Sequence, residues 1–352
     1  MPQKKVLAAM SGGVDSSVAA ALLVEQGYEV FGVTLKLHAQ SSRAIEDAAK
    51  TAQTLGIPHQ VINLSKEFYE KVISYFIDQY SHGNTPNPCV VCNKYIKFGL
   101  LMEKALAMGM EYITTGHYAA VEYDDHHGRW LLKKSKSSHK DQTYVLYNLT
   151  QEQMKHILFP MGEFRDKDQV RQIARKLNIE AAERPESQEI CFITHQTYGE
   201  YILKLRPELG KKGLIVDTRG KVLGEHDGVI NYTIGQRKGI GVAFGRPMYV
   251  VGLDAGNNRV IVGEEADLYS SELTASDVNY ISFDVPEGEM RVTAKIRYGA
   301  KEVDAVILPL EGSRARVRFS TPQKAVTPGQ SVVLYKNDLV VGGGIIEQLP
   351  GF

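Results

Sequence analysis

Three cysteines are the side chains of this sequence best suited to nucleophilic or metal chemistry. Cys89 and Cys92 stand in the segment Asn84–Asn93, NTPNPCVVCN, and Cys191 precedes Phe192. An odd and sparse set of cysteines argues against a disulfide-built scaffold and for reactive or metal-binding thiols. A redox CxxC pair needs its own βαβ context and a zinc site needs two further ligands, so we rank both below a role in sulfur transfer.

The first two cysteines lie near a predicted helix N-terminus. Two prolines stiffen the loop before them, and we expect a helix to start near Asn93 and to cover residues 94–108. The helix dipole, with Lys94 and Lys97 in the first turns, favours a nucleophilic thiolate at Cys92. For Cys191 a structural role has more weight, because a single Cys beside Ile190 and Phe192 is often a core residue.

A second chemical feature is the loop Ser11–Ser17, SGGVDSS, between a predicted strand and a predicted helix. Backbone N–H groups and the positive end of the helix dipole converge at such a junction, which suits it to bind phosphate. Gly12 and Gly13 allow close approach of the backbone, and the serines add hydroxyl donors. No Lys follows the glycines, so the loop is not a Walker loop, and its two adjacent glycines do not have the spacing of the GxGxxG dinucleotide fingerprint.

The elements that position these features alternate between strands and helices over the first half of the chain. We expect strands at 4–9, 28–35, 59–64 and 112–115, and helices at 14–23, 43–55 and 94–108. This alternation predicts an α/β domain with a parallel sheet, whose ligands bind at the carboxyl ends of the strands.

The sequence pattern changes near Gly213 to short β-rich segments separated by turns. After about Ser276, five segments have the spacing of a small antiparallel barrel. We therefore expect three regions: an α/β domain over 1–205, a small β-rich domain over 206–275 and a C-terminal β-barrel over 276–352.

Composition fits a globular protein without a general affinity for nucleic acid. The 352 residues include 41 Lys and Arg against 41 Asp and Glu, and 43% are hydrophobic. Zero net charge excludes a globally basic coat, so any RNA contact has to be local. No apolar run reaches the length of a membrane span and no signal peptide is recognisable, so we expect a cytoplasmic protein.

The loop SGGVDSS resembles the pyrophosphatase-type (PP-loop) motif of nucleotide alpha-hydrolase-like domains that adenylate a substrate. Further segments are Gly116-His117-Tyr118, TPNPxxxCNxxIKF from Thr85, KDQTYVLY from Lys140, SQEICF from Ser187, and the stretch Asn231–Gly241. Together these are similar to the tRNA-specific 2-thiouridylase (MnmA) family over nearly the whole chain. The resemblance implies an enzyme that adenylates O2 of the wobble uridine of tRNA with ATP and Mg²⁺ and then replaces it with sulfur.

The resemblance also implies roles for individual residues. Cys191 would carry a persulfide from a donor protein, a cysteine desulfurase or sulfur relay, and Cys92 would be the nucleophile, with a Cys92–Cys191 disulfide on release. The residues implied to bind ATP are Ala9, Met10, Ser11, Gly12, Gly13, Val14, Asp15, Ser16, Leu35 and Gly116. The residues implied to contact tRNA are Asn87, Pro88, Cys89, His117, Lys140, Asp141, Gln142, Arg297, Tyr298 and Gln330.

Cys89 departs from the family pattern, in which we expect Asp. A thiol at this position could take up protons or resolve Cys92 as a Cys89–Cys92 disulfide. Alternatively, Cys89, Cys92 and Cys191 could hold three irons of a [4Fe-4S] cluster and leave the fourth open to hydrosulfide.

Two other classes of function share parts of this pattern. A PP-loop ligase acting on a small molecule would use SGGVDSS but would not need the cysteine segment. A non-catalytic tRNA-binding sulfur carrier would use the thiols and barrel but not the nucleotide loop.

A run of basic residues follows a predicted hairpin. We expect this run to contact RNA phosphates. It comprises Lys133, Lys134, Lys136, His139 and Lys140.

Overall fold

The computed structural model describes residues 3–180, 190–242 and 245–348. It divides into two compact units, one of residues 1–72, 89–188 and 337–340 and the other of residues 73–88, 189–336 and 341–352. Ser187, Gln188 and Glu189 of the SQEICF motif lie outside the described residues. In the part of the chain that is described, no helix is long and apolar enough to cross a membrane.

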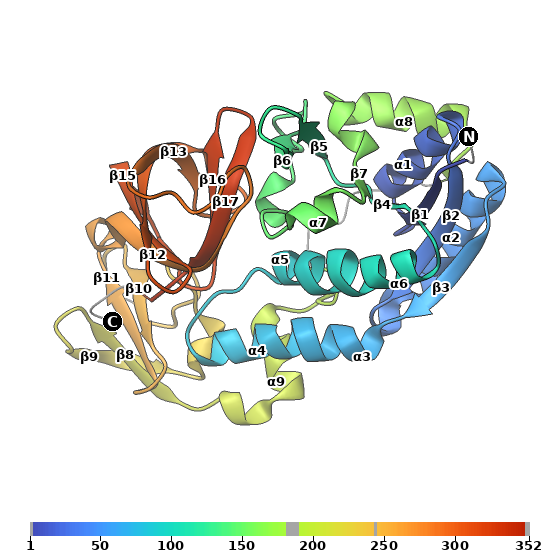
Figure 1. Ribbon diagram of the computed structural model, residues 1–352. Coiled ribbons are helices and arrows are strands. Elements are labelled where there is room, and N and C mark those ends of the chain that lie inside the picture. Colours follow the sequence, from blue (N-terminus) through green and yellow to red (C-terminus); the bar gives the residue numbers. More distant parts are fainter. Residues whose placement is uncertain (1–2, 181–189, 243–244, 349–352) are drawn as a thin grey trace. The chain divides into compact units, whose positions relative to one another are not determined.

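A parallel sheet forms the centre of the first unit, as expected (Figure 1). Its strand order is β3-β2-β1-β4-β7, and each adjacent pair is parallel. The strands are β1 (Lys5–Ala9), β2 (Glu29–Lys36), β3 (His59–Asn63), β4 (Tyr112–Thr114) and β7 (Ile157–Leu158). Consecutive residues of β1 are buried, which is the pattern of a strand covered on both faces.

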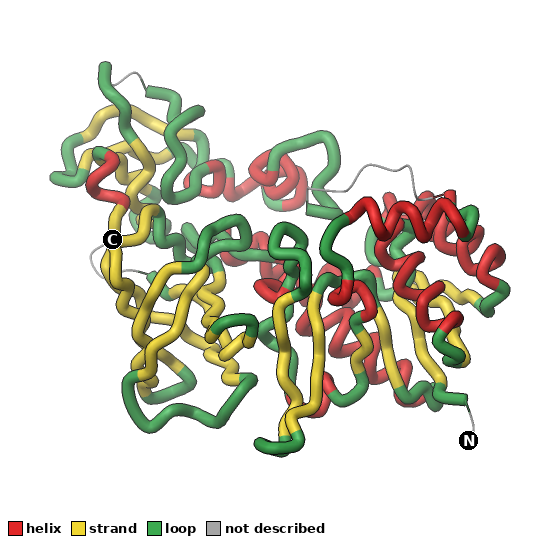
Figure 2. Tube along the Cα trace, turned by 90° about the horizontal axis from the view of Figure 1, so that it is seen from above, coloured by secondary structure: helices red, strands yellow, loops and turns green. Residues whose placement is uncertain are grey.

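Helices pack around this sheet, and Figure 2 shows its yellow strands among red helices. They are α1 (Val14–Glu25), α2 (Ser42–Leu55), α3 (Ser65–Phe68), α6 (Leu101–Ala107), α7 (Gln151–Met154) and α8 (Lys167–Lys176). Helix α1 is apolar on nearly all sides, as expected for a helix that is buried all round. It packs against the sheet and also against α8, where Val14 and Val18 contact Val170 and Ala174. The amphipathic α2 ends at Gly56, whose φ of 67° gives the left-handed C-cap that the sequence predicts.

The helix that carries the cysteines starts earlier than expected. Helix α5 spans Pro88–Cys92 and continues as the π-helix η3 (Asn93–Leu100) before α6. The expected start near Asn93 is therefore wrong, because Pro88 can occupy the first helical position, where its missing N–H costs nothing. Both cysteines consequently lie within the helix rather than in the loop before it, Cys89 in the first turn and Cys92 as the last residue of α5.

A hairpin and short helical turns complete the first unit. The hairpin strands are β5 (Ala119–Asp124) and β6 (Arg129–Lys134), and the turns are η1 (Ala39–Ser41), the π-helix η2 (Tyr69–Ile73), η4 (Thr143–Val145) and η5 (Pro160–Glu163). Lys133 and Lys134 were expected after the hairpin but lie within β6, where Lys133 is opposite Leu339.

The second unit contains α4 (Ser74–Ser81), α9 (Tyr198–Leu205) and two β structures. A four-stranded sheet has the order β10-β11-β8-β9, formed by β8 (Gly213–Asp217), β9 (Val222–His226), β10 (Tyr249–Asp254) and β11 (Arg259–Gly263). Short turns η7 (Pro207–Leu209), η8 (Val229–Asn231) and η9 (Glu265–Leu268) connect these elements.

The expected antiparallel barrel is present in this unit. It consists of β12 (Tyr269–Tyr280), β13 (Met290–Lys295), β14 (Val303–Leu310), β15 (Arg314–Lys324), β16 (Ser331–Lys336) and β17 (Leu339–Ile346). Pairing of β12 with both β15 and β17 closes it around an apolar core. Strand β12 is not among the strands that the sequence predicts, and it spans the boundary expected near residue 275.

Candidate active site

The phosphate loop is held in shape by its own hydroxyl and backbone groups. The Ser11 N–H donates to Oγ of Ser16 at 3.1 Å, and that hydroxyl donates to the Gly13 carbonyl at 3.1 Å. Gly12 has φ of 72°, and a Cβ there would lie 2.8 Å from the Ala44 carbonyl oxygen, so only glycine fits. The loop is thus preorganised with its N–H groups at the start of α1.

One serine expected to serve as a donor is directed elsewhere. Ser17 is fully buried, and its hydroxyl donates to the Gly13 carbonyl at 2.9 Å and lies 3.5 Å from Oγ1 of Thr51. It therefore joins α1 to α2 and is not available to a ligand, whereas Ser11 is exposed.

Asp15 is the charged residue of the loop, and both of its carboxylate oxygens are engaged. Oδ1 accepts a hydrogen bond of 2.8 Å from the Tyr118 hydroxyl, and Oδ2 lies 2.6 Å from Nζ of Lys167. Lys167 is not among the residues that the sequence motifs single out. The sequence gives one indication that such a residue is needed: no Lys follows the glycines, so a cation that binds phosphate at this loop would come from elsewhere.

The Gly116-His117-Tyr118 triplet supports this loop from the end of β4. A Cβ at Gly116 would lie 2.6 Å from the Ser16 nitrogen, so glycine lets the segment lie against the start of α1. The triplet is in turn fixed by Gln142, whose side chain accepts from the Tyr118 N–H at 2.9 Å and whose own N–H donates to the Tyr118 carbonyl at 2.9 Å.

His117 itself is buried between aromatic rings. Its Nδ1 lies 2.6 Å from Oγ1 of Thr115, and its ring packs against Phe98 and Phe159. Burial, reinforced by the positive charge of Lys97, holds the pKa of His117 well below its ordinary value, so the imidazole is neutral at physiological pH.

The other residues implied to bind ATP lie at the same carboxyl edge of the sheet. The Met10 N–H donates to the Val33 carbonyl at 2.8 Å, and the Thr34 hydroxyl donates to the Met10 carbonyl at 2.9 Å. These bonds fix Ala9 and Met10 beside the end of β2, where Leu35 is half-buried. Leu35 and the loop therefore belong to one edge of one sheet, as a nucleotide site requires.

The two cysteines of α5 lie three residues apart and so project from adjacent positions of one turn. Cys89 is exposed and Cys92 is buried, and neither they nor the exposed Cys191 of the second unit forms a disulfide. Protein atoms surround the exposed Cys89 closely enough that desolvation raises the pKa of its thiol, with Lys97 opposing the rise. Cys89 is therefore a thiol and not a thiolate at neutral pH.

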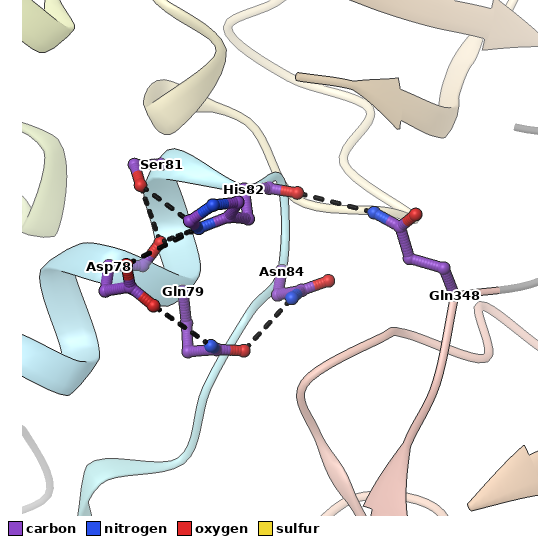
Figure 3. Close-up of polar contacts among 6 residues, drawn as sticks. All are labelled: Asp78, Gln79, Ser81, His82, Asn84 and Gln348. Carbon is purple, nitrogen blue, oxygen red and sulfur yellow. Dashed lines mark hydrogen bonds and ion pairs between the residues drawn. The ribbon is translucent and has the colours of Figure 1, made fainter. Parts of the chain in front are cut away.

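The chain that leads into α5 is anchored within the second unit. The Thr85 N–H donates to the Pro328 carbonyl at 2.8 Å, and Nε2 of Gln330 donates to the Thr85 carbonyl at 2.7 Å. Figure 3 shows the neighbouring contacts, in which Asn84 donates to the Gln79 side chain at 3.0 Å. Gln330, implied to contact tRNA, thus also holds the segment that precedes Asn87, Pro88 and Cys89.

The remaining residues implied to contact tRNA fall into two groups. Asp141 accepts from the Ser135 N–H at 3.0 Å, so Asp141 and Gln142 shape their own loop. Arg297 and Tyr298 are exposed next to β13.

Several of the basic residues already have partners. Lys133 pairs with Glu122 at 2.7 Å and Lys136 pairs with Glu163 at 2.5 Å. RNA phosphates would have to compete with these carboxylates. Among the residues that the structure describes, no group of three His, Cys, Asp or Glu side chains is arranged to hold a metal ion.

The fold and the loop define a HUP-type nucleotide-binding protein with two β domains. The family described as "tRNA methyl transferase HUP domain" matches residues 4–195, "tRNA methyl transferase PRC-barrel domain" matches 200–264, and "Aminomethyltransferase beta-barrel domain" matches 270–346. The expected fold class is confirmed.

Two curated relatives match almost end to end. The chain is 54% identical to "tRNA-specific 2-thiouridylase MnmA" of Acetivibrio thermocellus, over 99% of this chain and 100% of that protein. It is 54% identical to "tRNA-specific 2-thiouridylase MnmA 2" of Caldanaerobacter subterraneus subsp. tengcongensis, over 98% of each. The chain belongs to the tRNA-specific 2-thiouridylase family, whose members are ATP-using enzymes.

A solved structure described as "U34-tRNA thiolase NcsA from Methanococcus maripaludis with its [4Fe-4S] cluster" also matches, with a TM-score of 0.36 and 17% identity over 59% of this chain and 67% of that one. At this level of similarity nothing about its cluster transfers to this chain.

Proposed function

We propose that this enzyme 2-thiolates the wobble uridine of tRNA in an ATP-dependent reaction that yields 2-thiouridine, AMP and pyrophosphate. The observation that carries the proposal is that one compact unit combines the preorganised loop Ser11–Ser17 with the cysteine turn of α5. One part can activate an oxygen with ATP and the other can supply a sulfur nucleophile. Neither a small-molecule ligase nor a non-catalytic carrier would need both.

Activation of the base comes first, because an oxygen on a pyrimidine is a poor leaving group. The uracil O2 attacks the α-phosphorus, the bond from that phosphorus to the bridging oxygen breaks, and pyrophosphate leaves with the electron pair. The N3 proton is released as O2 becomes an imidate oxygen. The loop N–H groups and the residues implied to bind ATP, from Ala9 to Ser16 with Leu35 and Gly116, would orient the triphosphate, with Mg²⁺ offsetting its charge.

Sulfur transfer follows in two displacements. The terminal sulfur of a persulfide on Cys191, delivered by a cysteine desulfurase or sulfur relay, attacks C2, the C2–O bond breaks and AMP leaves with the electron pair. The Cys92 thiolate then attacks Sγ of Cys191, forming a Cys92–Cys191 disulfide and leaving the electron pair on the sulfur of 2-thiouridine. A thiol reductant restores both cysteines. The raised pKa of Cys89 suits it to hold a proton beside these steps, in place of the carboxyl that relatives are expected to carry.

A [4Fe-4S] cluster held by Cys89, Cys92 and Cys191 is the alternative source of sulfur. Desolvation raises the pKa of the Cys89 thiol and favours its protonated form, whereas a cluster ligand has to be a thiolate, so Cys89 fits the cluster less well than it fits a proton-holding role beside a persulfide. Anaerobic iron and sulfide analysis decides between the routes. A colourless, iron-free protein that thiolates tRNA from a persulfide donor excludes the cluster.

We further propose the division of labour that the sequence suggests. Residues 1–205 would bind ATP and carry out catalysis, residues 206–275 would form a small β domain, and residues 276–352 would contact tRNA. Asn87, Pro88 and Cys89 would lie beside the target base, which has to leave the anticodon stack to be adenylated. Such an enzyme would work in the cytoplasm, where its tRNA and ATP are available.

Mass spectrometry of tRNA nucleosides after incubation with ATP and a persulfide donor tests the proposal. We expect 2-thiouridine with the native protein and none with Cys92→Ser, which should still bind ATP because the phosphate loop is untouched. Formation of 2-thiouridine by Cys92→Ser would refute the role of Cys92, and ATP turnover driven by a small metabolite without tRNA would refute the proposed substrate.

A further inference from the structure

The phosphate loop brings negative charge but no positive charge of its own. Residues 9–17 include Asp15 and contain no Lys or Arg. A triphosphate bound there would meet N–H groups and one carboxylate, while the departing pyrophosphate gains charge as its bond to the α-phosphorus breaks. Phosphate-transferring sites ordinarily place cations at that position. Any protein cation that adds to the charge of Mg²⁺ at this site therefore has to come from outside the loop.

Helix α8 places one such cation at the loop. Lys167 is the first residue of α8, which is capped by the Asp166 side chain accepting from the Gln169 N–H at 2.9 Å. Its Nζ lies 2.6 Å from Oδ2 of Asp15, and the two side chains are only 12% and 29% exposed. Water and salt screen the attraction between such partly buried charges less than they screen a pair on an open surface.

The packing of α8 fixes this arrangement. Val170 and Ala174 of α8 are fully buried in one cluster with Val14 and Val18 of α1. Helices α1 and α8 lie beside each other (Figure 1). Since α1 begins at the phosphate loop, their packing fixes the start of α8, where Lys167 stands, relative to that loop. The ammonium group has three N–H donors, so contact with Asp15 is compatible with contact to a phosphate oxygen.

A second cation stands one turn further along the same helix. Arg171 follows Lys167 by four residues, which places both on one side of α8. Its Nε is buried and has no hydrogen-bond partner among the residues that the structure describes. A buried donor without an acceptor costs free energy, and a phosphate oxygen is an acceptor that guanidinium groups bind well.

We propose that Lys167 and Arg171 are phosphate-binding residues that form the cationic side of the ATP site and offset the charge of the leaving pyrophosphate. This inference rests on the proposed use of ATP at the loop Ser11–Ser17. In the free enzyme Lys167 neutralises Asp15. With ATP bound, both cations contact the β- and γ-phosphates, so they contribute to binding of ATP and pyrophosphate but not of AMP.

Titration calorimetry of the full-length protein with ATP, AMP and inorganic pyrophosphate, each with Mg²⁺, tests this assignment. For Lys167→Met we expect the Kd for ATP to rise roughly 10- to 100-fold, the loss of one charge-assisted hydrogen bond, with a similar rise for pyrophosphate and an unchanged Kd for AMP. Arg171→Met should show the same pattern. Lys176→Met, which removes an exposed cation from the last turn of the same helix, is the matched control and should bind all three ligands like the native protein.

The comparison of ligands separates a binding role from a structural one. Equal losses for ATP and AMP would show that Lys167 only shapes the loop through Asp15, and would overturn the inference, as would unchanged ATP binding in both variants. Thermal unfolding of each variant shows whether a loss of binding is caused by misfolding. If Lys167→Met misfolds, Lys167→Arg, which keeps the charge, is used in its place and should keep the native preference for ATP over AMP. A native protein that binds no ATP would instead refute the proposed function.

Discussion

Replacing Gly116 with alanine should displace the backbone of the phosphate loop while leaving every side chain that would bind ATP unchanged. The added Cβ would lie 2.6 Å from the Ser16 nitrogen, 2.9 Å from the Asp15 carbonyl carbon and 3.0 Å from the Ser16 Cα. All three are backbone atoms at the start of α1. They cannot rotate away as a flexible side chain could, so either α1 or the end of β4 has to move.

The size of the effect follows from these contacts. Overpacking that forces backbone shifts costs about 1–3 kcal/mol of folding stability. Moving the first turn of α1 also displaces the N–H groups on which a phosphate would depend. A hydrogen bond to a charged group contributes about 1.5–3 kcal/mol, so each one lost lowers ATP affinity roughly 10- to 100-fold.

Two measurements check this expectation on the same samples. Denaturant unfolding gives the loss of stability, and titration calorimetry with ATP and Mg²⁺ gives the loss of affinity. Gly288→Ala is the matched control, because a Cβ at Gly288 meets nothing within 4 Å and should change neither quantity. Native stability together with native ATP affinity in Gly116→Ala would refute the argument that this glycine lets β4 support the loop.

Three further changes test other parts of the site. The imidazole of an unfolded chain titrates near pH 6.5, whereas burial and Lys97 keep His117 neutral in the folded protein, so below that pH the unfolded state binds more protons. The free energy of unfolding should therefore fall with decreasing pH by up to about 1.4 kcal/mol per pH unit. His117→Gln should flatten this dependence of the unfolding free energy on pH, and an identical slope in the variant would contradict the argument. Cys89→Asp, which installs the carboxyl expected in relatives, should retain persulfide-dependent thiolation in an iron-free protein, and complete loss of 2-thiouridine by mass spectrometry would contradict the persulfide route. Lys133→Ala combined with Lys134→Ala should weaken tRNA binding in a filter assay and lower the salt slope by about 0.7–0.9 per lost phosphate contact, whereas unchanged binding at both low and moderate salt would remove these residues from the RNA surface.

How well the sequence predicts a feature depends on how far apart in the chain the interacting residues are. The loop Ser11–Ser17 and the helix stop at Gly56 are set by a few adjacent residues, so local patterns predict them correctly. The partner of Asp15 is different, since Lys167 is 152 residues away and no spacing rule connects the two. Likewise, whether Ser17 faces a ligand or Thr51 depends on how α2 packs against α1, which periodicity does not specify.

The cysteine helix illustrates a competition that sequence rules leave open. A proline before Cys89 is compatible with the end of a loop and with the first residue of a helix, and the structure takes the second option. The difference has a chemical consequence. At the end of α5 Cys92 is buried, so the reactivity of its thiol depends on whether a reaction partner can reach it as well as on the helix dipole.

The contacts of Gln142 connect the segment expected to touch tRNA with the segment expected to hold ATP. Gln142 makes two hydrogen bonds to the backbone of Tyr118, the Tyr118 hydroxyl donates to Asp15, and Asp15 pairs with Lys167. Each link is within 3 Å, so displacement of one member alters the hydrogen bonds of the next. An RNA that moves the loop around Gln142 would therefore change the position of the carboxylate that holds Lys167. If the segment Lys140–Gln142 contacts tRNA as the family resemblance implies, this chain of hydrogen bonds would connect that contact to the nucleotide loop.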